Sequence, residues 1–173
     1  MQIRFATAND ADAIARLHVQ SWQQTYRGTL SDHYLDELAL AERSQIWQRR
    51  LSAPAANQRV WLACDDKLLL GFCCLYLAQD AQWGSYLDNL HVAANAQGLG
   101  IGTRLMATAA VCVQAEYIKQ GLYLYCNQSN TSGQYFYRQR GGQVCGSEIW
   151  HAPDGSAVKA WRYVWASAAE LIK

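Results

Sequence analysis

A run of three alternating glycines is the feature of this sequence that most clearly suggests chemistry. Gly98, Gly100 and Gly102 follow an apolar stretch at 85–92 and precede a segment of helical character at 103–119. Glycine has no Cβ atom, so the backbone can turn tightly and approach a ligand closely. The free N–H groups at the start of the following helix, together with its positive dipole end, favour an anion. The pattern therefore predicts a site for a phosphorylated cofactor.

The spacing of the glycines argues against two common nucleotide-binding motifs. A dinucleotide fingerprint reads Gly-x-Gly-x-x-Gly, whereas the residue at the last of these positions is Thr103. That fingerprint also needs an acidic residue at the end of the next strand, and here the strand ends in Cys126 and Asn127. A P-loop would close with Gly-Lys-Ser/Thr, which the sequence lacks.

Two segments resemble the motifs of the GCN5-related N-acetyltransferases, which hold acetyl-coenzyme A. Residues 97–106, with Gln-x-x-Gly-x-Gly followed by Thr-Arg-Leu-Met, resemble the family's pyrophosphate-binding motif. Residues 130–142 resemble its second motif, with three elements in register: Asn130, the pair Phe136-Tyr137, and Gly141. The segment departs from the family at Gly133, usually alanine, and at Gly142, usually aromatic. The order and separation of the two motifs fit the family, and the flanking elements extend the resemblance over most of the chain.

The resemblance implies how the cofactor is held. In this family the central strand and the strand after it splay apart, and the pantetheine arm lies in the gap. The backbone of the central strand would then bind this arm, at Leu90, His91 and Val92. Main-chain N–H groups would hold the pyrophosphate, at Gln97, Gly98, Leu99, Gly100, Ile101, Gly102 and Thr103. Asn130 would either bind the cofactor or cap the next helix.

Tyr137 is the residue that the motif register predicts for catalysis. After an amine attacks the thioester, the departing thiolate must be stabilised or protonated, and a phenol near the sulfur can act as the general acid. The alternative is an aromatic side chain that packs the helix onto the sheet, as its neighbours Tyr135 and Phe136 suggest.

The attacking amine must also lose a proton, directly or through water. Asp88 on the central strand is the predicted catalytic carboxylate, with His91 as a second candidate and Glu148 as a weaker one. Asp88 would remove a proton through water or attract an ammonium group; a solvated strand carboxylate is the alternative. Three positions apart on a strand, Asp88 and His91 are expected on opposite faces, so at most one would reach a given pocket.

Trp22 and Tyr26 are the residues predicted to bind the acceptor. They belong to a stretch, Trp22 to Gly28, that resembles a subset of the family including polyamine acetyltransferases. The two rings would form a wall for a cationic or apolar amine, or else anchor a corner between two helices. Four acidic residues nearby would suit a polyamine: Asp32, Asp36, Glu37 and Glu42.

The elements expected around these residues follow the order β-α-α-β-β-β-α-β-α-β-β. This order matches the α/β (α+β) acyl-coenzyme A N-acyltransferase fold of the family, a mixed twisted sheet of about seven strands with helices on both faces. A doubly wound domain would instead alternate strictly between strand and helix. Residues 1–173 are predicted to form a single N-acetyltransferase domain.

Composition narrows the partners and the compartment. The net charge is +1, so the sequence offers no basic surface that would predict nucleic-acid binding. It also offers no lysine-rich helix that would predict binding to a membrane surface. The six cysteines form no Cys-x-x-Cys pair of metal or redox spacing, so most are expected to be small buried side chains and no metal is expected. The residues contain no signal-peptide pattern, which predicts a cytoplasmic protein.

These observations predict an enzyme that transfers an acetyl group from acetyl-coenzyme A to a primary amine of a small molecule such as a polyamine, by direct attack in a ternary complex. The enzymatic alternative acetylates a peptide N-terminus or a protein lysine. Alternatives of another class are a non-catalytic acyl-coenzyme A sensor and a nucleotide-binding domain. Many relatives pair, so a homodimer is a further expectation, with Trp161 and Trp165 of the last strand as candidate interface residues.

Overall fold

Seven strands form one mixed sheet in the computed structural model, which describes residues 1–66, 68–117 and 120–172. Across the sheet the order is β1-β2-β3-β4-β5-β7-β6, and β4–β5 is the one parallel pair. The strands are β1 (Gln2–Phe5), β2 (Gln58–Asp65), β3 (Leu68–Asp80), β4 (Gly84–Val92), β5 (Leu122–Asn127), β6 (Gln143–His151) and β7 (Ala157–Trp165). The predicted element order and fold class are confirmed.

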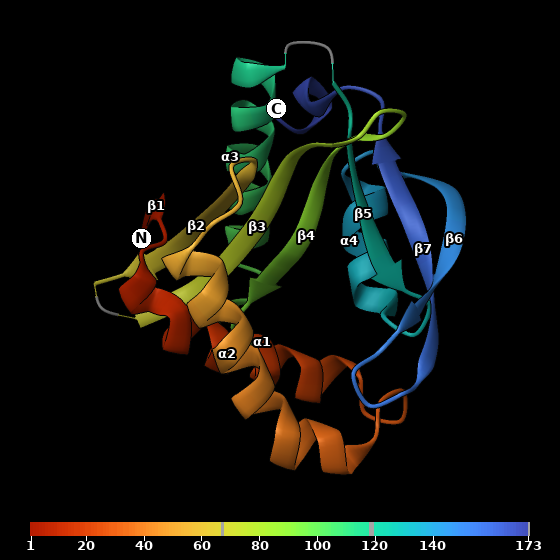
Figure 1. Ribbon diagram of the computed structural model, residues 1–173. Coiled ribbons are helices and arrows are strands. Elements are labelled where there is room, and N and C mark those ends of the chain that lie inside the picture. Colours follow the sequence, from red (N-terminus) through yellow and green to blue (C-terminus); the bar gives the residue numbers. More distant parts are fainter. Residues whose placement is uncertain (67, 118–119, 173) are drawn as a thin grey trace.

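Among the described residues, four α-helices surround the sheet (Figure 1). They are α1 (Ala11–Thr25), α2 (Ala39–Ser52), α3 (Ile101–Glu116) and α4 (Thr131–Gln139), and a π-helical turn (Tyr34–Leu38) leads into α2. Short 3-10 turns lie at Ala8–Asp10, Ala94–Ala96 and Ala168–Leu171. The helix expected at 103–119 begins two residues earlier and ends at Glu116, while Lys119 lies outside the described residues.

Apolar side chains pack on both faces of the sheet. On one face α1 and α2 cover β2 and β3, with Ile14, Trp47 and Phe72 buried between them. On the other face α3 packs against the sheet through residues such as Leu105 and Met106. The two sides of the central strands are therefore lined by different side chains. A ligand between the strands meets different chemistry on each side of the sheet.

The parallel pair β4–β5 opens toward the ends of the two strands. Its pairing is confined to Ser85 with Leu122 and Tyr86 with Tyr123. Beyond Tyr86 the arrows of β4 and β5 diverge in Figure 1. The edge of β4 that faces β5 thus carries backbone groups that no neighbouring strand pairs, which is the splay that the resemblance implied.

The structure also shows the state of the cysteines and the length of the helices. All six cysteines are free, with Cys73, Cys74 and Cys126 buried and the others half-buried. Burial raises the pKa of the Cys73 thiol to about 12, so it behaves as a small apolar side chain. Within the described residues, no helix is long and apolar enough to cross a membrane.

Candidate active site

A cavity of about 850 Å³ occupies the gap between β4 and β5. Its walls come from both strands, the glycine loop at 97–103, α1, α2, α4 and β6. The residues predicted for catalysis, for the cofactor and for the aromatic wall of the acceptor site all line it except Leu99, which is 71% exposed. The structure therefore brings the predicted residues together around one cavity.

In the glycine loop, the backbone conformation calls for glycine at Gly98 and Gly100, and packing calls for it at Gly102. Gly98 and Gly100 have φ angles of +80° and +77°, and an added Cβ at either would meet no other protein atom within 4 Å. A Cβ at Gly102, by contrast, would lie 3.2 Å from the Phe136 ring, so this glycine permits α4 to approach. Gly100 is the N-cap of α3, and the N–H groups of the next three residues have no partner within the helix. The open space beside these donors fits a pyrophosphate group.

Arg140 contacts the end of this loop and was missed by sequence reasoning. It follows α4, its Nε donates to Thr103 Oγ1 at 3.1 Å, and its guanidinium stacks over Phe136 at 3.8 Å from the ring centre. It lines the cavity beside the helix start, so it adds a permanent cation to the predicted anion site. Its position three residues after Tyr137 is the feature of the sequence that could have identified it.

Two substitutions at the second motif have structural reasons. Asn130 caps α4, because its Oδ1 accepts from Gly133 N at 2.9 Å and from Ser132 Oγ at 3.1 Å. A Cβ at Gly133 would lie 2.6 Å from the Asn130 side chain, which explains glycine in place of alanine. A Cβ at Gly142 would lie 2.7 Å from the Trp165 ring, which fills the space beside that position. Of the two predicted roles of Asn130, the capping role is observed, and its side chain also lines the cavity.

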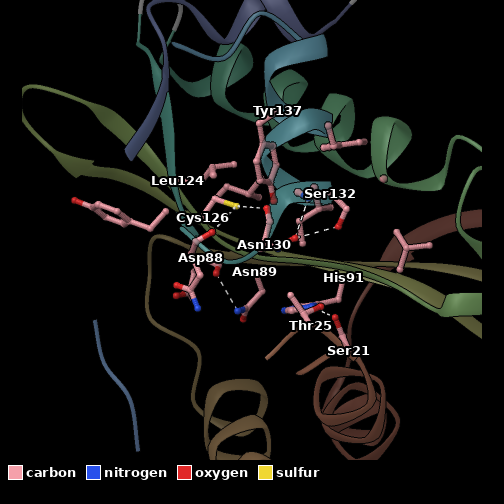
Figure 2. Close-up of a pocket in the computed structure, with 18 of the residues that line it drawn as sticks. Ser21, Thr25, Asp88, Asn89, His91, Leu124, Cys126, Asn130, Ser132 and Tyr137 are labelled. Carbon is pink, nitrogen blue, oxygen red and sulfur yellow. Dashed lines mark hydrogen bonds between the residues drawn. The ribbon is translucent and has the colours of Figure 1, made fainter. Parts of the chain in front are cut away.

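Tyr137 lies on the α3 side of the sheet, packed against Tyr163 at 5.6 Å and Trp165 at 6.3 Å between ring centres. Figure 2 shows the phenol reaching from α4 toward the gap, near Cys126 and Asn130. Burial raises its pKa, so the hydroxyl keeps its proton at neutral pH. The same packing holds the phenol in place, so the packing interpretation of Tyr137 is observed and the catalytic one stays a prediction.

A β-bulge changes the expected positions of Asp88 and His91. Across β3–β4, Cys74 faces Asn89 and Leu75 faces Leu87, so Asp88 has no partner and shifts the alternation of side chains. Asp88 and His91 consequently lie on the same side of β4, toward α1 and α2 (Figure 2). The expectation that they point to opposite faces is wrong, and both line the cavity.

The two carboxylates at the cavity are both bound by arginines. Asp88 Oδ2 accepts from Arg50 at 2.7 Å, and Arg50 was not identified from the sequence. Glu148 accepts from Arg162 at 2.6 Å and from the Tyr125 hydroxyl. The hydrogen bond from Tyr125, with help from Arg162, lowers the pKa of Glu148. Glu148 is therefore an ionised, hydrogen-bonded carboxylate and a poor proton acceptor.

Trp22 and Tyr26 contribute to the cavity wall and to the packing of α1. Together with Trp150 of β6 they form an aromatic cluster with ring centres 5.6–6.1 Å apart. Trp22 is buried, and the guanidinium of Arg43 lies 4.8 Å from its ring centre. Since a cation of the protein already stacks on Trp22, a cationic acceptor would meet Tyr26 and Trp150 more readily.

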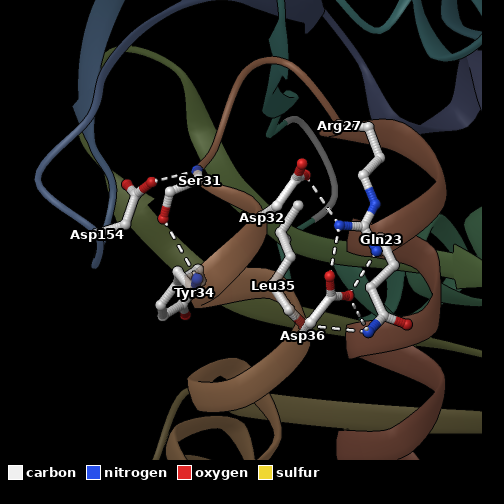
Figure 3. A network of polar contacts seen from close by, with 8 residues as sticks. All are labelled: Gln23, Arg27, Ser31, Asp32, Tyr34, Leu35, Asp36 and Asp154. Atoms are coloured by element: carbon white, nitrogen blue, oxygen red, sulfur yellow. Dashed lines mark hydrogen bonds and ion pairs between the residues drawn. The ribbon is translucent and has the colours of Figure 1, made fainter.

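The four acidic residues expected to suit a polyamine lie away from the cavity lining. Asp32 and Asp36 both bind Arg27, at 2.9 and 2.8 Å, in an exposed network (Figure 3). Glu42 binds Arg43 and the Tyr34 hydroxyl, and Glu37 is exposed. These acids are therefore not part of the cavity lining, and their role in binding a polyamine stays a prediction.

Two polar contacts join the connection between α1 and α2 to neighbouring loops. Asp154, in the β6–β7 turn, accepts from the Ser31 backbone N–H at 2.7 Å, which ties this turn to the connection (Figure 3). Thr29 of the connection contacts Ser129, in the loop between β5 and α4, at 3.2 Å. The candidate interface residue Trp165 is fully buried within the chain, where its Nε1 donates to Arg140 O at 2.7 Å.

Comparisons with known proteins agree with this geometry. A sequence model of the Acetyltransferase (GNAT) family matches residues 13–142. A probable N-acetyltransferase of Mycobacterium tuberculosis is 25% identical over 150 residues, which cover 84% of this chain and 82% of the relative. A GCN5-related N-acetyltransferase from Rhodopseudomonas palustris superposes with a TM-score of 0.76 at 19% identity, covering 95% of this chain and 94% of that one. The PaiA N-acetyltransferase of Thermoplasma acidophilum, solved in complex with coenzyme A, gives a TM-score of 0.66 at 20% identity, covering 92% and 98%.

Proposed function

The chain belongs to the GNAT acetyltransferase family and is an N-acetyltransferase, and from this premise we propose that it transfers the acetyl group of acetyl-coenzyme A to the primary amine of a small molecule. The observation that carries the proposal is the gap between β4 and β5, with the glycine loop and Tyr137 along it. Coenzyme A would supply the acetyl group as a reactive thioester. In this proposal residues 1–173 act as one catalytic domain.

Different residues of the gap would hold different parts of the cofactor. The unpaired backbone of β4, at Leu90, His91 and Val92, would bind the amides of the pantetheine arm as an added strand does. The N–H groups at the start of α3 and the Arg140 guanidinium would hold the pyrophosphate. A backbone N–H of β4 aimed at the thioester oxygen would stabilise the charge that develops there, a contribution of about 3 kcal/mol for one such donor.

Tyr137 would protonate the departing sulfur. Its phenol keeps a proton at neutral pH because burial raises its pKa, and the same dry surroundings disfavour a free thiolate. Asp88, held by Arg50, would contribute a fixed negative charge on the side from which an ammonium group approaches. Trp22 and Tyr26 would bound the acceptor.

A small acceptor is favoured over a long peptide by the aromatic wall of the cavity. Trp22, Tyr26 and Trp150 line the cavity with ring centres 5.6–6.1 Å apart, and they would bound a pocket for a small amine. A long peptide would need an open groove instead.

The first experiment is release of the coenzyme A thiol from acetyl-coenzyme A, measured against pools of polyamines, amino acids, aminoglycosides and short peptides. Release with one pool supports the proposal and identifies the acceptor class. Absence of release with every pool, together with no rise in the melting temperature on adding coenzyme A, would contradict the proposed activity.

Tyr137→Phe tests the proposed acid, with Tyr135→Phe as a matched control. Tyr135 lies on the same helix and is 67% exposed, so its hydroxyl has no part in the cavity. We expect Tyr137→Phe to lower kcat by roughly 10²–10⁴-fold, the usual contribution of a general acid, with little change in the Kd of acetyl-coenzyme A. Tyr135→Phe should leave both values unchanged. Equal turnover of the two variants would remove Tyr137 from the mechanism.

A further inference from the structure

His91 is held in the cavity wall by contacts on three sides. Its Nδ1 lies 2.8 Å from Ser21 Oγ of α1. Its ring packs against Phe72 of β3 at 5.1 Å and against His18 of α1 at 4.6 Å between ring centres. These contacts fix the plane of the imidazole, and its Nε2 has no hydrogen-bond partner among the described residues.

His18 packs against the His91 ring and carries no charge. Trp47 Nε1 donates to His18 Nδ1 at 3.0 Å, which places the proton of the neutral His18 ring on Nε2. Burial lowers the pKa of His18 well below its usual value, and the nearby His91, Arg43 and Arg50 oppose a further positive charge. His91 therefore packs against a ring that stays neutral at physiological pH.

A ring nitrogen without a hydrogen-bond partner among the described residues distinguishes His91 from the other candidate bases. Burial lowers the pKa of His91 to about 4, so the ring is neutral at physiological pH. Asp88 lies on the same side of β4, but its Oδ2 already accepts from Arg50. Glu148 is similarly bound by Arg162 and Tyr125.

We propose that His91 accepts the proton of the acceptor amine through Nε2, and that Ser21 positions the ring for this step. The inference rests on the proposed acetyl transfer and assigns a residue to it. It requires the tautomer in which Nδ1–H donates to Ser21 Oγ, because this leaves Nε2 free. Pairing with Phe72 of β3 places His91 on the α1 side of β4, whereas Tyr137 lies on the α3 side.

The protons balance as follows. The acceptor arrives as an ammonium group, one proton moves to His91 Nε2, and the lone pair released on the amine nitrogen then forms the bond to the acetyl carbon. As the carbon–sulfur bond breaks, Tyr137 gives its proton to the sulfur, and the surplus proton on the new amide nitrogen restores the phenol. His91 then passes its proton to water, because its low pKa prevents it from staying charged. One proton is released per turnover.

The test is the pH dependence of kcat/KM for wild type and His91→Gln, with the acceptor that releases most coenzyme A in the pooled assay. Glutamine keeps a polar side chain but cannot take the proton. In wild type the ammonium form reacts, so kcat/KM should change little with pH below the pKa of the amine. In His91→Gln only the free amine reacts, so kcat/KM should rise about tenfold per pH unit. The ratio of the two should thus start near 10²-fold at pH 7 and shrink as the pH rises.

Controls separate a chemical role from a structural one. Asp88→Asn should lower kcat/KM by a factor that does not vary with pH, and Ser21→Ala should show the trend of His91→Gln with smaller amplitude. A ratio for His91→Gln that stays constant with pH would overturn the proposal. If that variant fails to fold, the wild-type profile decides, because a tenfold rise per pH unit in wild type would also overturn it. Either result leaves the proposed acetyl transfer intact, whereas no release from any pool would remove the acetyl transfer itself.

Discussion

Gly100→Ala separates the conformational role of the glycine loop from its role in binding. Gly100 caps the N-terminus of α3 with φ +77° and ψ 4°, in the left-handed region. An alanine Cβ there meets no protein atom within 4 Å, so the substitution causes no clash within the chain. The Cβ does enter the open space beside the N–H groups of 101–103, where the pyrophosphate would lie.

The cost to stability follows from the backbone alone. An alanine in the left-handed region is less stable than glycine by roughly 1–2 kcal/mol. For a chain of this length each kcal/mol corresponds to about 2–4 °C, so the melting temperature should fall by roughly 2–8 °C. The cost to cofactor affinity comes on top, since the added methyl group displaces the phosphates from the donors. We expect a loss of at least about tenfold in Kd, or about 1.4 kcal/mol.

Gly28→Ala is the matched control. Gly28 has φ +75°, an added Cβ there also meets nothing within 4 Å, and it lies in the connection between α1 and α2. Both variants should lose similar stability in a thermal melt without ligand, whereas in calorimetric titration with acetyl-coenzyme A only Gly100→Ala should lose affinity. Equal affinities for both variants and wild type would refute the assignment of the loop to the pyrophosphate.

Two further substitutions test the interior and the first helix. Trp47→Phe leaves Nδ1 of the buried His18 without its donor, so the free energy of unfolding in urea should fall by about 1–3 kcal/mol; a change below about 0.5 kcal/mol would contradict this. The hydrogen bond from Arg4 lowers the pKa of Asp10 to about 2, below its unfolded value of about 3.9. The ionised Asp10 therefore stabilises the fold above pH 4, and this stabilisation is lost as the pH falls through 2. Asp10→Asn should melt lower than wild type at pH 7, and the difference should shrink between pH 4 and pH 2; a constant difference would be inconsistent with the pairing.

Local patterns in the sequence predicted the conformation of the glycine loop and the order of the elements around it. The φ angles of Gly98 and Gly100 and the start of α3 depend on a few consecutive residues, so their spacing carries the information. The cap at Asn130 is also local, because its partner Gly133 lies three residues away. The element order was predictable for the same reason, since each strand and helix has its own pattern.

Pairing across the fold is what the sequence did not reveal on the acceptor side. The bulge at Asp88 depends on how β4 aligns with Cys74 and Leu75 of β3, and no pattern within β4 reports it. The ion pair of Asp88 with Arg50 joins residues 38 positions apart. The acidic residues after α1 are near the acceptor residues in sequence, yet Arg27 holds Asp32 and Asp36 away from the cavity.

The two faces of β4 separate the proposed base from the proposed acid. An imidazole and a phenol in direct contact would hydrogen-bond to each other, and neither would then be free for the substrate. Because His91 pairs with Phe72 of β3, its side chain faces α1, while Tyr137 reaches the gap from α4 on the other side of the sheet. An amine that enters between them meets a neutral proton acceptor on one side, and the sulfur that leaves on the other side meets a protonated donor. The bulge at Asp88 adds a carboxylate to the side of His91, so its negative charge lies beside the entering amine and away from the departing sulfur.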